Sequence, residues 1–218
     1  MDRNFQRALK LVLKHEGGWA DHPKDPGGAT MKGVTIGTFR AYVKPNATKA
    51  DLRAITDEQL ATVYRRHYWD AVLGAELPDG VDYAVFDFAV NSGPKRAAQY
   101  LQGVVGVSQD GRIGPATLKA VRSIPHAKVI NDLCDARMSF LKRLKTWPTF
   151  RKGWTSRVSG VRSEALKMIS TAPAPSPVPR PAPPVDDPVV TVPPAPKAEK
   201  RGFWTAIGAL LKAIFRRE

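Results

Sequence analysis

Residues 81–93, VDYAVFDFAVNSG, constrain the fold more than any other segment of this chain. They are apolar around almost the whole circumference of a helix, and a helix of this kind is buried on all sides in a protein core. Gly93 stands where it would end the helix. The segment therefore predicts a central, buried helix.

Amphipathic patterns on both sides of this segment predict further helices. A first helix over residues 3–16 is indicated by one apolar stripe, which consists of Phe5, Leu9, Val12 and Leu13. Thr56 and Gln59 resemble a capping box, which would open a helix ending near Trp69. We expect the remaining helices over residues 94–103, 115–123, 126–146 and 157–169.

Residues 21–37 differ from the rest of the folded part, because they combine turn-forming residues with β-branched ones. The pair Pro26-Gly27 suits the centre of a type II turn, and Val34 to Ile36 favour a strand. We therefore predict an all-α domain with one small β-hairpin after its first helix.

A proline-rich stretch ends the folded part near residue 170. Residues 171–200 contain eleven prolines and have no core-forming pattern, which is typical of an extended linker. Residues 203–215, FWTAIGALLKAIF, are amphipathic, with basic residues at both ends. They are too short to span a bilayer and favour a helix lying at an anionic membrane surface. A terminal helix docked on the enzyme is the alternative.

Charge and cysteine content narrow the class of protein. The net charge of +14 predicts affinity for a polyanion, and residues 1–170 carry 27 basic and 16 acidic residues. The basic residues are dispersed without a nucleic-acid-binding motif, so we expect no nucleic-acid partner. The lone Cys134 excludes an intramolecular disulfide and is expected to be buried. The N-terminus lacks a signal-peptide pattern, so synthesis in a cytoplasm is expected.

Glu16 is the first candidate for catalysis. It follows the apolar face of the first helix and therefore points toward the interior, and it lies where unpaired helix carbonyls carry partial negative charge. Both effects oppose ionisation, and a carboxyl that keeps its proton suits a general acid. A solvated glutamate at a helix end is the alternative.

Asp25 lies nine residues after Glu16, across the predicted turn. Two carboxyl groups brought together by a short loop fit glycoside hydrolysis, in which one protonates the leaving oxygen and the other assists attack at the sugar. Asp before Pro-Gly is also a common turn residue, which is the structural alternative for Asp25.

Three segments carry a resemblance to a known family. EGGWADHPKDPGGATMKGVTIGTF from Glu16 onward resembles the N-terminal signature of glycoside hydrolase family 108, which comprises N-acetylmuramidases with a lysozyme-like helical fold. FDFAVNSGPKRAAQYLQ and GVSQDGRIGPATLKAV resemble the second half of that family, a peptidoglycan-binding region. The resemblance implies a catalytic lobe at 1–75 and a packed helical lobe at 76–170, before the linker at 171–200 and the tail at 201–218.

The resemblance also assigns roles to single residues. Glu16 would be the catalytic acid, and Asp25 with Thr30 would hold or activate the attacking water. Because the spacing from Asp25 to Thr30 is one residue shorter than in phage lysozymes, Thr35 is the alternative. Both inverting and retaining routes stay open. Sugar contacts are expected from the remaining candidates, which are Trp19, His22, Thr35, Asn91 and Ser92.

A zinc site is only weakly supported by the sequence. His15, His22 and Asp25 could form one, but a fourth, distant ligand is not evident, so no metal or other cofactor is expected.

Asp87 lies on the apolar segment 81–93 and needs a partner if it is buried. It could support the active site from behind, or it could pair with an arginine.

These observations predict a monomeric, phage-type endolysin. It would cleave the β-1,4 bond between N-acetylmuramic acid and N-acetylglucosamine, would act in the periplasm or cell envelope, and would promote host lysis. The alternative is a non-catalytic protein that binds cell wall or membrane on a lysozyme-like scaffold.

Overall fold

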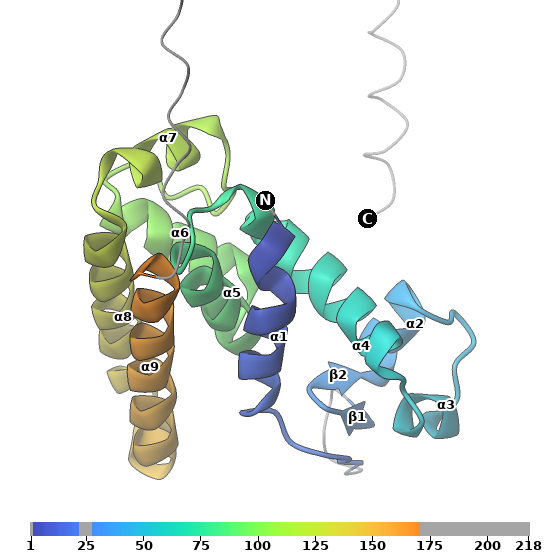
Figure 1. The fold of residues 1–218 in the computed structure, drawn as a ribbon. Helices are drawn as coiled ribbons and strands as arrows, with labels where there is room; N and C mark the ends of the chain where they lie inside the picture. The colour runs from blue at the N-terminus through green and yellow to red at the C-terminus, as the bar shows by residue number, and fades with distance from the viewer. Residues whose placement is uncertain (1, 22–27, 171–218) are drawn as a thin grey trace, which may run out of the picture. The chain divides into compact units, whose positions relative to one another are not determined.

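A computed structural model describes residues 2–21 and 28–170 of the chain. This part is mostly helical, with one two-stranded sheet, as Figure 1 shows. The predicted fold class, a helical lysozyme-like domain with one small hairpin, is therefore confirmed. The Pro-rich linker and the amphipathic tail lie outside the described residues.

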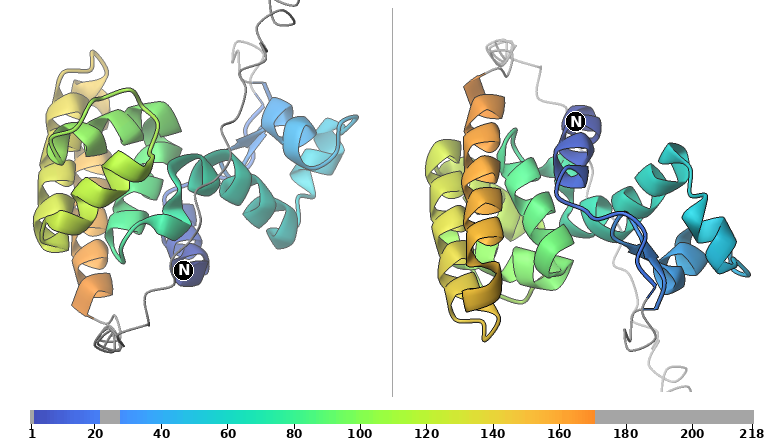
Figure 2. Two further views of the ribbon diagram at one scale, coloured as in Figure 1. Left: turned by 90° about the horizontal axis from the view of Figure 1, so that it is seen from above. Right: turned by 90° about the horizontal axis from the view of Figure 1, so that it is seen from below.

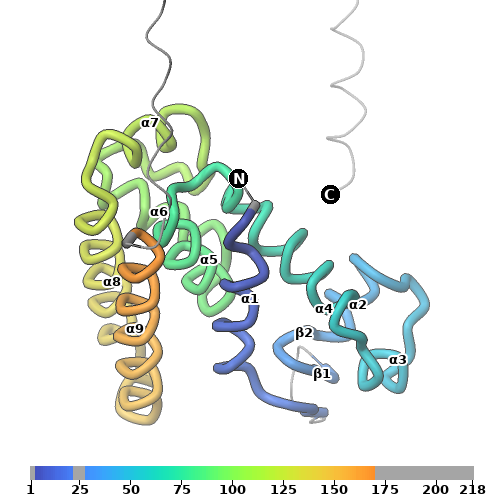
Figure 3. The backbone as a smooth tube through the Cα atoms, in the orientation of Figure 1, coloured from blue at the N-terminus to red at the C-terminus, as the bar shows by residue number. Residues whose placement is uncertain are grey.

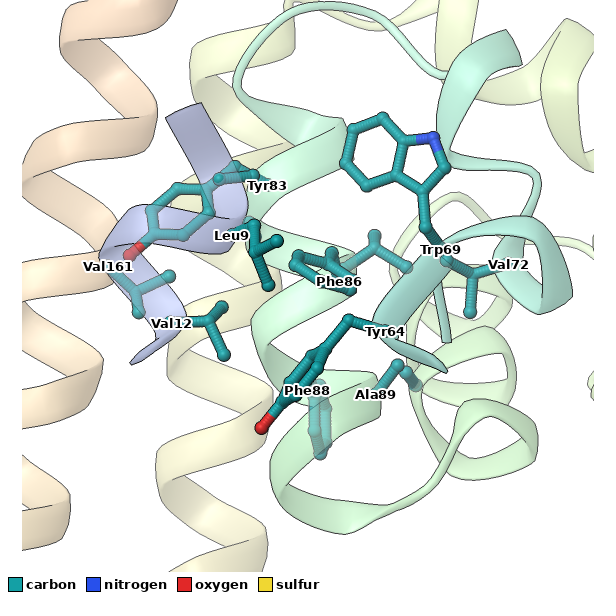
Figure 4. Packing of buried hydrophobic residues seen from close by; sticks show 14 of the residues in the cluster. Leu9, Val12, Tyr64, Trp69, Val72, Tyr83, Phe86, Phe88, Ala89 and Val161 are labelled. Atoms are coloured by element: carbon teal, nitrogen blue, oxygen red, sulfur yellow. The ribbon is translucent and has the colours of Figure 1, made fainter. Parts of the chain in front are cut away.

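The predicted central helix is α5 (Val81–Ser92). Residues 81–89 are all buried, and α5 packs against α1, α6, α8 and α9. The Phe86 ring meets Trp69 and Tyr64 edge-on, with ring centroids 5.4 and 6.5 Å apart, respectively. Figure 4 shows Leu9 and Val12 of α1 packed in the same cluster. The pattern that predicted a helix buried on all sides is thus confirmed.

Helix α1 (Phe5–Leu13) is shorter than the sequence predicts. A single 3₁₀ turn, η1 (Asp2–Asn4), precedes it, and a turn follows it at residues 14–15. Glu16 was expected in the last helical turn but lies after the helix. Gly17 and Gly18 disfavour a longer helix, because glycine has a low helix propensity. The chain then leaves the helix axis, and Ala20 pairs with Thr30.

The β-hairpin consists of β1 (Thr30–Met31) and β2 (Val34–Thr35). Its turn is Lys32-Gly33, where both residues have positive φ, 47° and 76°, as a two-residue type I′ turn requires. The predicted turn at Pro26-Gly27 lies outside the described residues. The expected hairpin therefore exists, but it turns at Lys32-Gly33.

Short helices complete the lobe around the hairpin. Helices α2 (Ile36–Tyr42) and α3 (Lys49–Arg53) were not predicted, because neither is long enough to show a periodic pattern. The capping box of Thr56 and Gln59 is confirmed at the start of α4 (Asp57–Tyr64). A π-helical turn, η2 (Arg65–Trp69), and two 3₁₀ turns, η3 (Asp70–Val72) and η4 (Gly74–Glu76), follow α4. As Figure 2 shows, α4 and η2 connect this lobe to the helical bundle.

The second half of the folded part contains α6 (Pro94–Val104), α7 (Pro115–Ser123), α8 (His126–Lys142) and α9 (Trp147–Ser170). The predicted helix at 126–146 ends earlier, at Lys142. The helix predicted at 157–169 begins ten residues earlier, at Trp147. Pro148 is compatible with the first helical turn, and packing along α8 offsets the cost of Gly153 and Gly160. Figure 3 shows α8 and α9 side by side.

A buried glutamine fixes the loop between α6 and α7. Gln102 donates hydrogen bonds to the Asp110 carboxylate at 2.7 Å and to the Arg112 carbonyl at 3.0 Å. It also accepts a hydrogen bond from the Gly111 amide at 2.9 Å. The loop is therefore anchored to α6. Among the described residues Cys134 is free and buried, as predicted, and none of the described helices is long and apolar enough to cross a membrane.

Candidate active site

Glu16 lies at the point where the chain leaves α1. Its amide donates to the Leu13 carbonyl at 3.3 Å, and the His15 amide donates to the Val12 carbonyl at 2.9 Å. The Glu16 side chain is 18% exposed. The carboxyl is therefore largely withdrawn from water, as the sequence predicts, although its residue is not helical.

Arg157, from α9, contacts the Glu16 carboxyl directly. Its Nη1 and Nη2 atoms both lie 3.2 Å from Glu16 Oε1, and the two residues are 141 positions apart in the sequence. Arg157 was not predicted from the sequence. Periodicity places it at the start of a helix, but does not reveal which distant carboxylate the side chain meets.

Arg157 is shared with a second carboxylate, that of Asp87 on α5. Arg157 Nε donates to both Asp87 oxygens at 3.2 and 3.1 Å, and Nη2 lies 3.0 Å from Oδ2. Arg137 of α8 donates to Asp87 Oδ1 at 2.6 Å. We call these residues, Arg137, Asp87, Arg157 and Glu16, the ion chain. Arginines alternate with carboxyl groups along it, so the buried charge of Asp87 and that of Arg157 each have a partner of opposite sign.

The pKa shifts follow from this arrangement. Burial alone would raise the pKa of Asp87, but Arg137 and Arg157 together hold it below its ordinary value. Burial likewise opposes the charge of Arg157, but Asp87 and Glu16 raise its pKa above the ordinary value. Asp87 and Arg157 are therefore both charged at neutral pH. The need for a buried partner, predicted for Asp87, is met by two arginines.

The environment of Glu16 differs from the one that the sequence suggests. The Glu16 carboxyl is largely buried, but it is also paired with the Arg157 guanidinium. The expectation of an inward-facing carboxyl whose surroundings all oppose ionisation is therefore incomplete. The missing element is a cation supplied by a helix from the other end of the folded part.

The other Glu16 oxygen lies against the hairpin turn. A Cβ atom on Gly33 would come within 2.8 Å of Glu16 Oε2 and 2.6 Å of the Tyr64 hydroxyl. Tyr64 Oη donates to the Lys32 carbonyl at 2.8 Å. Burial, with a further contribution from the Glu16 charge, raises the pKa of Tyr64 and of Tyr68. Both phenols therefore stay protonated beside the carboxyl.

Thr30 and Thr35 face each other across the hairpin, because the register pairs them directly. The Thr35 hydroxyl accepts from the Thr38 amide at 3.1 Å and caps α2. The Thr30 hydroxyl donates to the Gly28 carbonyl at 3.2 Å. Directly opposed residues share one face of the ladder, so both threonines lie on the same side of the hairpin.

The remaining candidates are dispersed. Trp19 is half-buried, and the Arg53 guanidinium lies 5.5 Å from its ring centroid. Asn91 and Ser92 are half-buried at the end of α5, where Ser92 Oγ donates to Asn91 Oδ1 at 3.0 Å. Within residues 2–21 and 28–170, neither of these two side chains hydrogen-bonds to Glu16. His22 and Asp25 lie outside the described residues.

The described residues contain no group of three His, Cys, Asp or Glu side chains that could hold a metal ion. The hypothetical zinc site of His15, His22 and Asp25 lies partly outside the described residues. The chemistry that the described groups can support is proton transfer at a partly buried carboxyl, with a neighbouring guanidinium to stabilise negative charge.

Two family models and one solved structure match this chain. Residues 9–93 match the family model of glycosyl hydrolase 108, and residues 96–159 match that of a predicted peptidoglycan domain. A solved structure described as that of Brucella abortus SagA is 51% identical, with a TM-score of 0.69. The similarity covers 77% of this chain and 97% of that chain.

The comparison with curated proteins gives no match. The similarity to the SagA structure extends over nearly all of that chain, and the two family models together cover most of the part described here. The chain belongs to glycosyl hydrolase family 108 and is a lysozyme-like glycoside hydrolase that degrades peptidoglycan.

Proposed function

We propose that this protein is an N-acetylmuramidase, which hydrolyses the β-1,4 bond between N-acetylmuramic acid and N-acetylglucosamine with Glu16 as general acid. One observation carries the assignment. In a family of glycoside hydrolases, Glu16 is a largely buried carboxyl held between α1, the hairpin turn and Arg157. Because its position is fixed by these contacts, it can be presented to a substrate without reorganisation.

In this proposal the two carboxyl oxygens of Glu16 have different roles. Oε1 accepts from Arg157, and Oε2, next to Gly33, carries the proton to the glycosidic oxygen. Proton transfer leaves Glu16 as a carboxylate, and the adjacent guanidinium stabilises that product of the step. The guanidinium also holds the carboxyl in place before the step.

Asp25 and Thr30 complete the proposed reaction by holding or activating the water that attacks the anomeric carbon. Thr30 is favoured over Thr35, because the Thr35 hydroxyl is engaged in capping α2. The anomer released from the substrate distinguishes the two stereochemical routes: inversion means direct attack of water, and retention means a covalent intermediate.

Contacts to the sugar rings are assigned to Trp19, His22, Thr35, Asn91 and Ser92. The three of them that lie outside the hairpin and within the described residues, Trp19, Asn91 and Ser92, are all partly exposed. Trp19 offers a ring for stacking, while the amide and hydroxyl of Asn91 and Ser92 suit N-acetyl and hydroxyl groups. These residues form the proposed substrate-binding set.

The general-acid role is tested by Glu16→Gln. This variant keeps the shape of the side chain but has no transferable proton, so we expect the rate of clearing of a peptidoglycan suspension to fall about 10²–10⁴-fold. Glu76→Gln is the matched control, since Glu76 is a 60%-exposed glutamate, and it should clear as the parent does. Equal clearing by the Glu16 variant would exclude the general-acid role and favour a non-catalytic wall-binding protein.

The bond that is cleaved is tested by mass spectrometry of the digested peptidoglycan. We expect fragments with muramic acid at the reducing end. Reducing-end glucosamine would instead identify a glucosaminidase, and free stem peptides would identify an amidase. Either of these results would contradict the proposed specificity.

The biological role that we propose is that of a phage-type endolysin that promotes host cell lysis from the periplasm or envelope. The net charge of +14 would hold the protein to the anionic wall. Residues 201–218 would add contact with an anionic membrane. We propose that the protein acts as a monomer, because all four residues of the ion chain belong to the same polypeptide.

A further inference from the structure

Three aromatic side chains near the start of α9 form one group, which we call the aromatic stripe: Trp147, Phe150 and Trp154. The ring centroids of Phe150 and Trp154 are 5.4 Å apart, and those of Trp147 and Trp154 are 6.2 Å apart. The interplanar angles are only 31° and 35°. The rings are therefore tilted against one another, neither stacked in parallel nor edge-on.

The aromatic stripe is open to solvent. Phe150 is 50% exposed, more than any other large hydrophobic residue among those described, and the two tryptophans are half-buried. Exposed aromatic rings that touch one another form a continuous apolar surface, and such surfaces on soluble proteins mark binding sites. The stripe is therefore a candidate binding surface.

The stripe leads to the ion chain. Trp147, Phe150, Trp154 and Arg157 follow the spacing that places residues on one face of a helix. Ten residues of helix from Trp147 to Arg157 span about 15 Å. In Figure 1 and in the right view of Figure 2, the Trp147 end of α9 and the end of α1 point toward the same side of the folded part. Glu16 follows α1 directly.

A glycan strand has the right chemistry for this surface. One face of a β-linked pyranose ring presents C–H groups, which pack on an aromatic ring, while its hydroxyl groups project from the edge toward water. Aromatic rings that follow one another along a helix can accept successive sugars in this manner. The polar rim of the sugar needs no buried partner there, because the stripe is on the surface.

Charge near the stripe favours peptidoglycan over a neutral polysaccharide. Lys145, Arg151 and Lys152 are exposed at this end of α9, and none of them forms an ion pair with another described residue. Glycan strands of peptidoglycan carry stem peptides with free carboxylates. The cations can therefore bind the peptides while the aromatic rings bind the sugars.

We propose that the aromatic stripe binds the peptidoglycan glycan strand on one side of the cleaved bond, as an extension of the active site along α9. The proposal rests on the proposed muramidase function, because the strand that the stripe binds is the one presented to Glu16. The stripe would lengthen the bound segment and would make affinity depend on chain length.

The test uses the full chain with Glu16→Gln as an intact, inactive binder. Isothermal titration calorimetry would measure its Kd for purified glycan strands that carry stem peptides and for a single disaccharide-peptide unit. In this background we expect Phe150→Ala to weaken strand binding about tenfold. Phe150→Trp should restore binding, and Leu73→Ala, which removes another exposed hydrophobic side chain, should bind as the parent does.

Two results would overturn the proposal. One is an equal Kd for strands in the Phe150→Ala and Leu73→Ala variants. The other comes from a parallel measurement of binding to anionic vesicles. If Phe150→Ala lost vesicle binding but kept strand binding, the stripe would be a membrane-binding surface. Because binding is measured in an inactive variant, these outcomes are separate from failure of the muramidase proposal, which would appear as absence of reducing-end muramic acid in digests by the parent protein.

Discussion

Arg157 is the residue on which the candidate site depends, because one guanidinium serves two carboxylates. The fork of five donors lets an arginine contact Asp87 and Glu16 at the same time, which a lysine ammonium cannot do with the same geometry. Asp87 is fully buried and also pairs with Arg137. Asp87 therefore holds Arg157 in the position in which its guanidinium contacts Glu16.

Loss of this contact should lower both stability and activity. Arg157→Gln leaves the buried Asp87 with only one of its two arginines and leaves Glu16 without its neighbouring cation. Removing one partner of a buried ion pair costs about 3–5 kcal/mol, so urea unfolding should show a loss of about that size. The Glu16 carboxyl would also lose a contact that holds it in place, so clearing of peptidoglycan should slow about tenfold or more.

Arg157→Lys retains a positive charge, but a lysine cannot contact both carboxylates with the same geometry. It should therefore lose less stability than Arg157→Gln and still be less stable than the parent. Arg122→Gln removes an exposed arginine that lies near Glu76, far along the chain from Glu16, and serves as control. Equal stability of Arg157→Gln and Arg122→Gln would contradict the pairing of Arg157 with two carboxylates.

Asp82 gives a second prediction at the level of one residue. Burial raises its pKa to about 6, although Asn4 and the Tyr83 amide donate to its oxygens. The folded protein thus holds this proton more tightly than the unfolded chain. The stabilising contribution is present below about pH 4 and is lost as pH rises through about 6.

Asp82→Asn cannot titrate and keeps an acceptor oxygen for Asn4. Urea unfolding at pH 4 and pH 6.5 should therefore show the variant gaining about 2–3 kcal/mol relative to the parent between the two pH values, since a tenfold change in proton affinity corresponds to about 1.4 kcal/mol. A difference between variant and parent that does not change with pH would show that Asp82 has no raised pKa.

Among the secondary-structure elements, the hairpin turn is built around the carboxyl. Lys32-Gly33 forms a tight turn whose carbonyl accepts from Tyr64, and Gly33 leaves room for Glu16 Oε2. A side chain at Gly33 would be strained by its positive φ and would collide with both groups. The two-residue turn thus determines how closely the hairpin approaches the acid.

Gly33→Ala should lower both stability and activity. The left-handed conformation costs an alanine about 1–2 kcal/mol, and displacement of the carboxyl should slow clearing of peptidoglycan about tenfold or more. Gly37→Ala is the matched control. A Cβ there meets nothing closer than 3.8 Å within a helix, so it should be neutral or stabilising by about 1 kcal/mol. Thermal unfolding and peptidoglycan-clearing rates should be measured for both variants. Equal stability and equal clearing by the two would contradict the packing described for the turn.

Helix α9 has three parts with different roles. Its first turns carry the aromatic stripe, and its middle carries Arg157. The final turns pack through Val161, Ala165 and Met168 into the core. One continuous helix therefore fixes the distance between the proposed glycan-binding rings and the acid, which a flexible connection could not do.

In the molecule as a whole, the two family models describe parts of one site. Glu16 lies in the segment that matches glycosyl hydrolase 108, while Arg157 lies in the segment that matches the predicted peptidoglycan domain. Because these two residues are in direct contact, the second segment contributes to the surroundings of Glu16. Separating the segments would leave Glu16 without its cation.

The tail gives a prediction for the full chain. Deletion of residues 201–218 should leave the clearing of purified peptidoglycan unchanged, because the ion chain and the hairpin lie within residues 16–157. The same deletion should reduce binding to anionic liposomes in a co-sedimentation assay, since it removes an amphipathic segment with basic ends. Unchanged liposome binding would exclude the tail as the membrane contact.

Local sequence was sufficient to predict the helical class, the central buried helix, the existence of a hairpin and the inward-facing carboxyl of Glu16. These features depend on periodicity, on glycine and on turn chemistry, which a linear chain displays directly. Helix ends were less well determined. Gly17 and Gly18 indicate that α1 stops, but the pairing of Ala20 with Thr30 accounts for its end at Leu13.

The surroundings of Glu16, in contrast, come from tertiary packing alone. The contact with Arg157 joins residues 141 positions apart, and the bridge to Asp87 joins residues 70 apart. An arginine on a helix face is ordinarily exposed, and nothing in its local sequence distinguishes one that will be buried against two carboxylates. Long-range packing of α1, α5 and α9 brings these charges together, and only in that arrangement does burial make their pairing necessary.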